Sequence, residues 1–118
     1  EKIDKTVYSL TDADTKEWNT AIKFFLTHFD YDLIPFMIAS FFAESIGVYD
    51  AIKCLEERLD YLKKNHEGLT RQIKELEMEK DILYYVIGNV QHNALIIETE
   101  ITVTQLMINK YKSKIASQ

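Results

Sequence analysis

Glycine and proline are scarce in this chain of 118 residues, which contains three glycines and one proline. Because these residues interrupt helices and form tight turns, their scarcity favours an all-helical chain with few turns. With one cysteine, Cys54, the chain forms no internal disulfide, so we expect a reducing, cytoplasmic setting. The longest uncharged run, residues 82–97, is too short and too polar to span a membrane, and no secretory signal is predicted.

The sequence also lacks a basic patch. The net charge is −5, and residues 53–80 hold seven basic and seven acidic side chains, interleaved. Residues 31–52 hold three acidic side chains and none that is basic. Because DNA binding depends on cations that neutralise a row of phosphates, we expect this chain alone to bind DNA poorly.

Two short helices are predicted in the first part of the chain. Thr11 is expected to cap a helix from Asp12 to about His28, because its hydroxyl accepts hydrogen bonds from free backbone N–H groups. Pro35 falls within the first turn of the second helix, where its missing N–H costs nothing. This second helix is apolar nearly all round, so we expect it to be buried on several sides.

Two long helices are predicted next. The first begins near Val48 and continues through Gly68 to about Lys80, and the second follows a charged turn at residues 77–81. Each carries apolar residues at alternating spacings of four and three, which place them on one seam of a helix. The sequence therefore predicts an all-α fold: two short helices plus two long antiparallel amphipathic helices, with a short β-strand at the N-terminus.

The second seam is the predicted dimer interface. Two helices in a chain this small cannot cover each other's seams completely, so we expect a second copy of the chain to cover the rest. The residues predicted to contact that copy are Leu83, Ile87, Val90, Ile97, Ile101, Ile108 and Ile115.

Signatures of catalysis and of cofactor binding are missing. None of the three histidines follows a glutamate at a spacing of three, and there is no His-Glu-x-x-His motif or glycine-rich phosphate loop. We therefore predict no enzyme activity, no metal and no cofactor. Cys54 is interpreted as a buried structural residue. His66, on the first seam, is interpreted as a packed histidine, with a pH-sensitive or metal-binding role as the alternative.

Trp18, the only tryptophan, allows two interpretations. It is favoured as a core anchor between the first helix and the long helices. Alternatively it is one wall of an apolar effector pocket together with Phe25, Met37 and Phe41, because aromatic residues and methionine line such pockets.

The order of these segments resembles one known family. The stretch Lys5–Asp12 is similar to the K-x-Y-x-L-T-x-x-G end of the wing in PadR-like transcriptional regulators. In that family a short helix containing a tryptophan follows, then an apolar segment like residues 34–43, a long charged helix and a final amphipathic helix. Asp14 stands where the family usually has glycine, and the helix-turn-helix that precedes the wing in the family is missing from this sequence.

The resemblance implies a division into residues 1–11, the end of a winged-helix wing, and residues 12–118, a helical dimerisation and effector-sensing domain. It implies a homodimer that senses a small apolar or aromatic effector and contacts DNA only through a winged-helix head that this sequence lacks. Lys2 and Lys5 would then lie near DNA phosphates, or else be solvated terminal charges. Because the chain starts at Glu1, we expect a fragment or a processed product. The alternative function is a stand-alone helical adaptor that binds a partner protein through its long helices.

Overall fold

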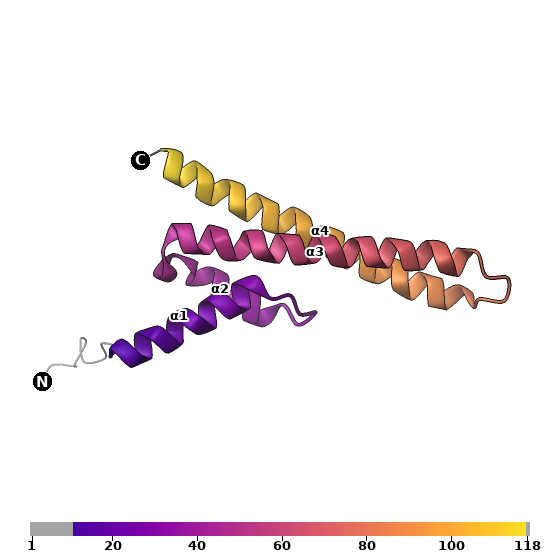
Figure 1. Cartoon of the computed structure of the whole chain (residues 1–118), viewed down its shortest axis with the longest axis horizontal. Helices are drawn as coiled ribbons and strands as arrows, with labels where there is room; N and C mark the ends of the chain where they lie inside the picture. The colour runs from indigo at the N-terminus through magenta and orange to yellow at the C-terminus, as the bar shows by residue number, and fades with distance from the viewer. Residues whose placement is uncertain (1–10, 118) are drawn as a thin grey trace, which may run out of the picture.

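The computed structural model describes residues 11–117, and these residues are all in helices or in the turns that connect them (Figure 1). The helices are α1 (Asp12–Thr27), α2 (Ile34–Phe41), the short 3-10 helix η1 (Ala43–Ile46), α3 (Val48–Glu77) and α4 (Tyr84–Ala116). The predicted all-α fold of two short and two long helices is confirmed. The predicted N-terminal strand falls on residues 1–10, outside the described residues.

The two long helices form an antiparallel hairpin. α3 and α4 lie side by side and run in opposite directions, and residues 78–83 turn the chain at one end of the molecule (Figure 1). The last part of α4 diverges from α3 at the opposite end, where α1 also begins. Within residues 11–117, no helix is both long enough and apolar enough to cross a membrane.

α1 and η1 pack against α3, and α2 packs against α1 and η1, so that the short helices and the first half of α3 create the main core. Apolar side chains at helical spacing meet there, because each helix has one side rich in small or aliphatic residues. The core residues are Ile22 and Leu26 of α1, Phe36 and Ala39 of α2, Ala43 of η1, Ala51, Ile52, Cys54 and Leu55 of α3, and Ile108 of α4. Cys54 is buried, in agreement with its interpretation as a structural residue.

Local sequence signals explain where the helices begin. The hydroxyl of Thr11 accepts a hydrogen bond from the backbone N–H of Asp14 at 3.0 Å, so the predicted cap is confirmed. Gly47 connects η1 to α3 with φ of +93°, a backbone conformation that residues with a Cβ rarely adopt. Gly68 lies inside α3, which continues through it as predicted.

Candidate functional site

The residues predicted to contact a second copy belong to α4, except Leu83, which immediately precedes it, and they fall into three groups by exposure. Ile97 and Ile108 are buried within the single chain, with 0% and 1% of their surface exposed. Leu83 is exposed, and the remaining residues are partly buried: Ile87, Val90, Ile101 and Ile115. Since Ile97 and Ile108 are already covered by their own chain, only the other residues of this seam have surface left for a partner.

An apolar stripe on α2 has no cover within the chain. Its four side chains are spaced so that they share one face of the helix, and between 53% and 86% of their surface is exposed. We call it the α2 stripe, and it consists of Ile34, Met37, Ile38 and Phe41. The opposite side of α2 enters the core through Phe36 and Ala39. The expectation that α2 is buried on several sides is therefore wrong for the single chain, because its neighbours cover one side only.

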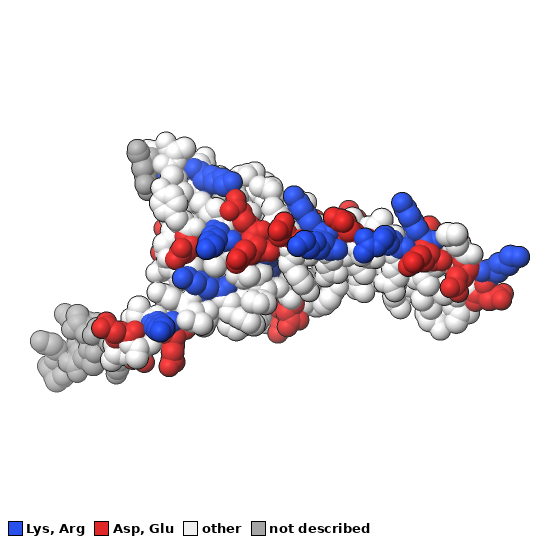
Figure 2. Space-filling view, in the orientation of Figure 1, with Lys and Arg blue, Asp and Glu red and all other residues white. Residues whose placement is uncertain are grey.

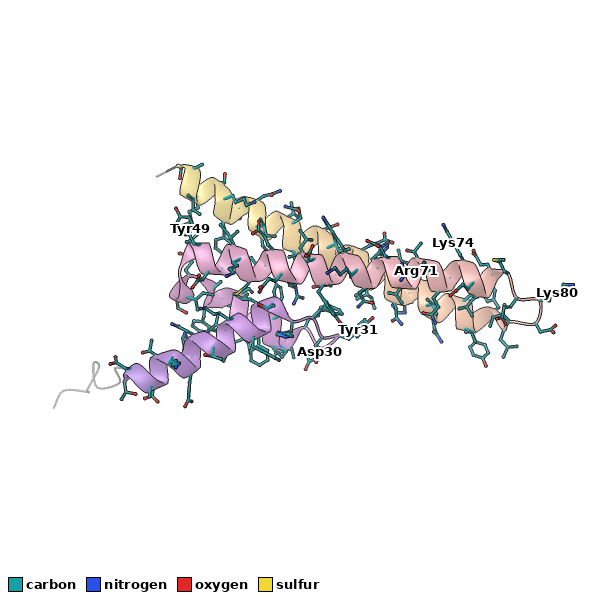
Figure 3. The ribbon with its side chains drawn as sticks, viewed as in Figure 1. Asp30, Tyr31, Tyr49, Arg71, Lys74 and Lys80 are labelled. Atoms are coloured by element: carbon teal, nitrogen blue, oxygen red, sulfur yellow. The ribbon has the colours of Figure 1, made fainter. Side chains whose placement is uncertain are left out.

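A second uncovered surface runs along α4, on the side away from its buried residues. It contains Leu95, Thr99, Val103 and Leu106, all exposed and none charged. Charged side chains gather instead in a band along α3 (Figure 2). Lys74 of α3 and Lys80 of the hairpin turn project away from the body of the molecule (Figure 3). The helical hairpin thus has one strongly solvated helix and one helix with an apolar outer face.

The residues predicted as an effector pocket all lie at the surface of the single chain. Trp18, Phe25, Met37 and Phe41 belong to the exposed large hydrophobic residues. Phe25 lines a shallow hollow of about 630 Å³ along α1, and the other three do not join it there. Met37 and Phe41 belong to the α2 stripe. Within one chain, therefore, these four residues do not enclose a ligand.

Trp18 joins α1 to the end of α2 and to η1. Its Nε1 donates a hydrogen bond to Oγ of Ser45 at 3.0 Å, and its ring packs edge-on against Phe42 with 5.0 Å between the centroids. Trp18 shares a side of α1 with Ile22 and Leu26, but it packs at the edge of the short helices, and 38% of its surface is exposed. Trp18 therefore makes a surface contact between the short helices. The favoured interpretation was a core anchor between the first helix and the long helices, and the structure does not place Trp18 there.

A buried ion pair lies at the centre of the molecule, and the sequence analysis missed it. The guanidinium of Arg58 on α3 is fully buried and donates from Nη2 to Oε1 of Glu100 on α4 at 3.1 Å. Its Nη1 donates to the backbone carbonyl of His28, just after α1, at 2.7 Å. The ring of Phe36 on α2 lies 3.7 Å from the guanidinium carbon. One arginine of α3 therefore contacts groups from three other segments.

A signal for this pair is present in the sequence. Arg58 lies three residues after Leu55 and four before Leu62, and both leucines are fully buried. Glu100 has the same spacing from Ile97 and from the next buried residue along α4, Thr104. A charged residue at buried-face spacing on each of two helices indicates that the charges meet inside the fold. The seam predicted for the first long helix continues from Leu55 through Leu59, a neighbouring register in which Arg58 is not a seam residue, and Leu59 is only partly buried.

The burial of the Arg58 guanidinium has a free-energy cost. Burial lowers the pKa of Arg58 below its ordinary value, while the hydrogen bond and the charge of Glu100 act in the opposite direction. Within the described part of the chain, Nε of Arg58 and Oγ1 of Thr104 are buried without a hydrogen-bond partner. Buried polar atoms of this kind cost free energy, so we expect the cluster to position the helices more than to stabilise them.

His66 also connects the long helices, because its Nε2 lies 3.0 Å from Oε2 of Glu98. The contact is at the surface, so His66 is a solvent-edged member of the hairpin. Among residues 11–117 no three histidine, cysteine, aspartate or glutamate side chains are grouped closely enough to hold a metal ion. Lys2 and Lys5, the predicted phosphate contacts, lie outside the described residues.

Comparison with protein-family models, with curated proteins and with solved structures finds no match to this chain.

Proposed function

We propose that this chain is the dimerisation part of a cytoplasmic PadR-like transcriptional regulator and that a second copy covers the α2 stripe. The observation that carries the proposal is this stripe of four exposed apolar side chains on a helix whose other side is already in the core. Contiguous exposed apolar residues mark interaction surfaces in water-soluble folds. The segment order shared with PadR-like regulators supports a regulator as the context.

The energetics favour a self-complementary contact. Complete burial of a large apolar side chain contributes about 1.5–3 kcal/mol, and in a two-fold interface each residue is buried twice. Association costs at least about 4 kcal/mol in lost freedom, and a stable interface covers roughly 1,000 Å² or more. The α2 stripe supplies the apolar centre. The outer face of α4 and the partly buried Ile101 and Ile115 of the second seam, which lie away from the hairpin turn, supply further area.

Such a dimer would fix the distance between two DNA-reading heads. α1 begins at the end of the molecule opposite the hairpin turn, and in PadR-like regulators the wing precedes this helix (Figure 1). Two heads at a constant separation read two half-sites of a symmetric operator. In the same proposal, a small aromatic effector at Trp18, Phe25, Met37 and Phe41 is enclosed only after the second copy closes over the α2 stripe.

Sedimentation equilibrium at micromolar concentration tests the dimer. The wild-type chain should have twice the mass of one 13.8 kDa chain. Phe41→Asp should shift it to the monomer, because a charge would then be buried in the interface. Met78→Asp is the matched control: Met78 is 83% exposed and Phe41 86%, but Met78 lies at the hairpin turn, far from α2. A wild-type monomer, or equal effects of the two substitutions, would contradict the proposal.

The adaptor remains the second candidate, because a helix from another protein could also cover the α2 stripe. One measurement, the oligomeric state of the chain, distinguishes the two candidate functions. A chain that is monomeric at micromolar concentration and still unfolds cooperatively would favour the adaptor, whereas a dimer that depends on Phe41 favours the regulator.

A further inference from the structure

A hollow of about 640 Å³ lies between η1 and the last turns of α4. Its apolar part is formed by Met107 and Tyr111, which also pack against the core. Its polar part is formed by Glu44 of η1 and by Lys110 and Lys114 of α4, with two serine hydroxyls nearby. The volume is within the range of small-molecule sites, roughly 300–1,000 Å³. The residues of α4 that line the hollow belong to the part of this helix that diverges from α3 (Figure 1).

The charges around this hollow are unevenly matched. Nζ of Lys114 lies 2.7 Å from Oε2 of Glu44, so these two charges neutralise each other. Lys112, on another side of α4, pairs with Glu56 at 3.2 Å. Within residues 11–117 Lys110 has no carboxylate in ion-pair distance. The hollow therefore carries one uncompensated positive charge, in a chain whose net charge is −5.

The interaction of a cation with the C-terminal end of the helix dipole does not explain the position of Lys110. Cations stabilise the C-terminal end of a helix, but the effect is confined to about the last turn. Lys114 is the basic residue in the last turn of α4, whereas Lys110 lies one turn earlier. The phenol of Tyr111 is neutral and able to donate a hydrogen bond at neutral pH, because the ordinary pKa of tyrosine is about 10. Burial, followed by the charge of Glu44, raises the pKa of Tyr111 further, and Lys114 partly opposes this. A cation, a neutral donor and an apolar floor therefore surround one space.

We propose that this hollow binds a small organic monocarboxylate, with its apolar body against Met107 and Tyr111 and its carboxylate at Lys110. One carboxylate matches one unpaired cation, and a second negative charge would face Glu44. All groups of the site belong to one chain, so the proposal does not depend on the dimer. The site is distinct from the predicted effector residues on α1 and α2.

Amide-resolved NMR titration of the whole isotope-labelled chain tests the site. The probe is 1-naphthaleneacetate, and the comparison is 1-naphthaleneacetamide, which has nearly the same shape and no charge. We expect chemical-shift changes at residues 43–46 and 107–117. The carboxylate should bind about fivefold more tightly, which corresponds to about 1 kcal/mol, the value of a partly exposed ion pair.

Two variants locate the charge effect. Lys110→Gln should abolish the preference for the carboxylate and leave binding of the amide unchanged, because Lys110 is exposed and its replacement leaves the core intact. Lys16→Gln is the control, since Lys16 lines the hollow of similar volume on α1. Equal binding of the two probes, shift changes centred on α1, unchanged behaviour of Lys110→Gln, or no shift change at millimolar probe would each overturn the proposal.

Discussion

Arg58 shows how one side chain can determine the arrangement of a small helical fold. Its guanidinium contacts Glu100 of α4, the carbonyl of His28 after α1 and the ring of Phe36 on α2. Arg58 thus connects α3 to α4, to the end of α1 and to α2. A buried charge tolerates few arrangements, because each alternative packing leaves it without its partner. We therefore expect the pair to select one packing of the helices at some cost in stability.

Glu100→Ala should lower the free energy of unfolding by about 3–5 kcal/mol, because Arg58 would remain buried without its carboxylate. The double variant Arg58→Met, Glu100→Leu should recover most of this loss, since neither charge is then buried. Urea unfolding at one fixed protein concentration measures both effects, because a dimer makes stability depend on concentration. A loss below about 1 kcal/mol for Glu100→Ala would show that the pair is solvated.

Tyr111 should make the fold sensitive to alkaline pH. Burial, and secondarily Glu44, raise the pKa of Tyr111 in the folded chain, while Lys114 partly opposes them. The stabilising contribution is therefore complete below the unfolded pKa of about 10 and is lost as pH rises through the folded value. Tyr111→Phe should remove this part of the pH dependence. The measurement is the free energy of unfolding of both proteins below and above that pH; parallel curves would contradict it.

At the scale of the helices, local helix propensity and tertiary packing contribute separately to the stability of each helix. α3 continues through Gly68 because the apolar residues on both sides keep one phase and pack against the rest of the fold. α2 is shorter and lacks a side-chain cap, and its N-cap residue is Leu33. Its stability comes from Phe36 and Ala39 in the core. Long helices in this fold are thus tolerant of local defects, whereas the short one depends on tertiary contacts.

Two glycines should respond oppositely to alanine. Gly68→Ala should stabilise the chain by about 0.8–1.0 kcal/mol, the difference in helix propensity, because the nearest atom to the new Cβ would be 3.9 Å away. Gly47→Ala should destabilise it although its surroundings are open, because φ of +93° is strained for alanine. Thermal unfolding followed by circular dichroism measures both shifts. Changes of the same sign would contradict this account.

At the scale of the whole molecule, the distribution of charge and of apolar surface is uneven. Charged side chains line α3 (Figure 2), while the α2 stripe and the outer face of α4 remain apolar and uncovered. Cationic and anionic residues alternate along α3, so no surface there has one sign. A molecule with this distribution is suited to contact another apolar protein surface and poorly suited to contact a polyanion.

This chain should not bind duplex DNA in a sequence-specific, salt-sensitive way. With a net charge of −5 and no basic stripe, it has too few cations to displace the counterions of a phosphate row. A gel-shift series with random duplex DNA and with candidate palindromic operators, at rising salt concentration, measures this. Retention of one operator over scrambled DNA at physiological salt would contradict the prediction and would place a DNA-reading surface within this chain.

Local sequence patterns were sufficient for the helices themselves. The cap at Thr11, the start of α3 at Val48 and its continuity through Gly68 were predicted, because caps, glycine positions and apolar periodicity act over a few residues. The same patterns carry no information about which helix covers which face. The seam of α4 was assigned to a second copy, but the structure buries Ile97 and Ile108 inside one chain.

Only the tertiary structure determined which distant residues contact each other and which side chains remain exposed. Arg58 and Glu100 are 42 residues apart, and their contact requires the hairpin to close in one register. The exposure of Phe41 was equally hidden, because an apolar side chain fits either a core or an interface, and composition is the same in both cases. Helix formation follows from interactions within a few residues, whereas burial depends on which distant surfaces meet. For this reason the helices could be derived from the sequence, and the exposure of the α2 stripe could not. For the ion pair, the sequence shows that Arg58 and Glu100 each have the spacing of buried residues, but only the tertiary structure shows that they contact each other.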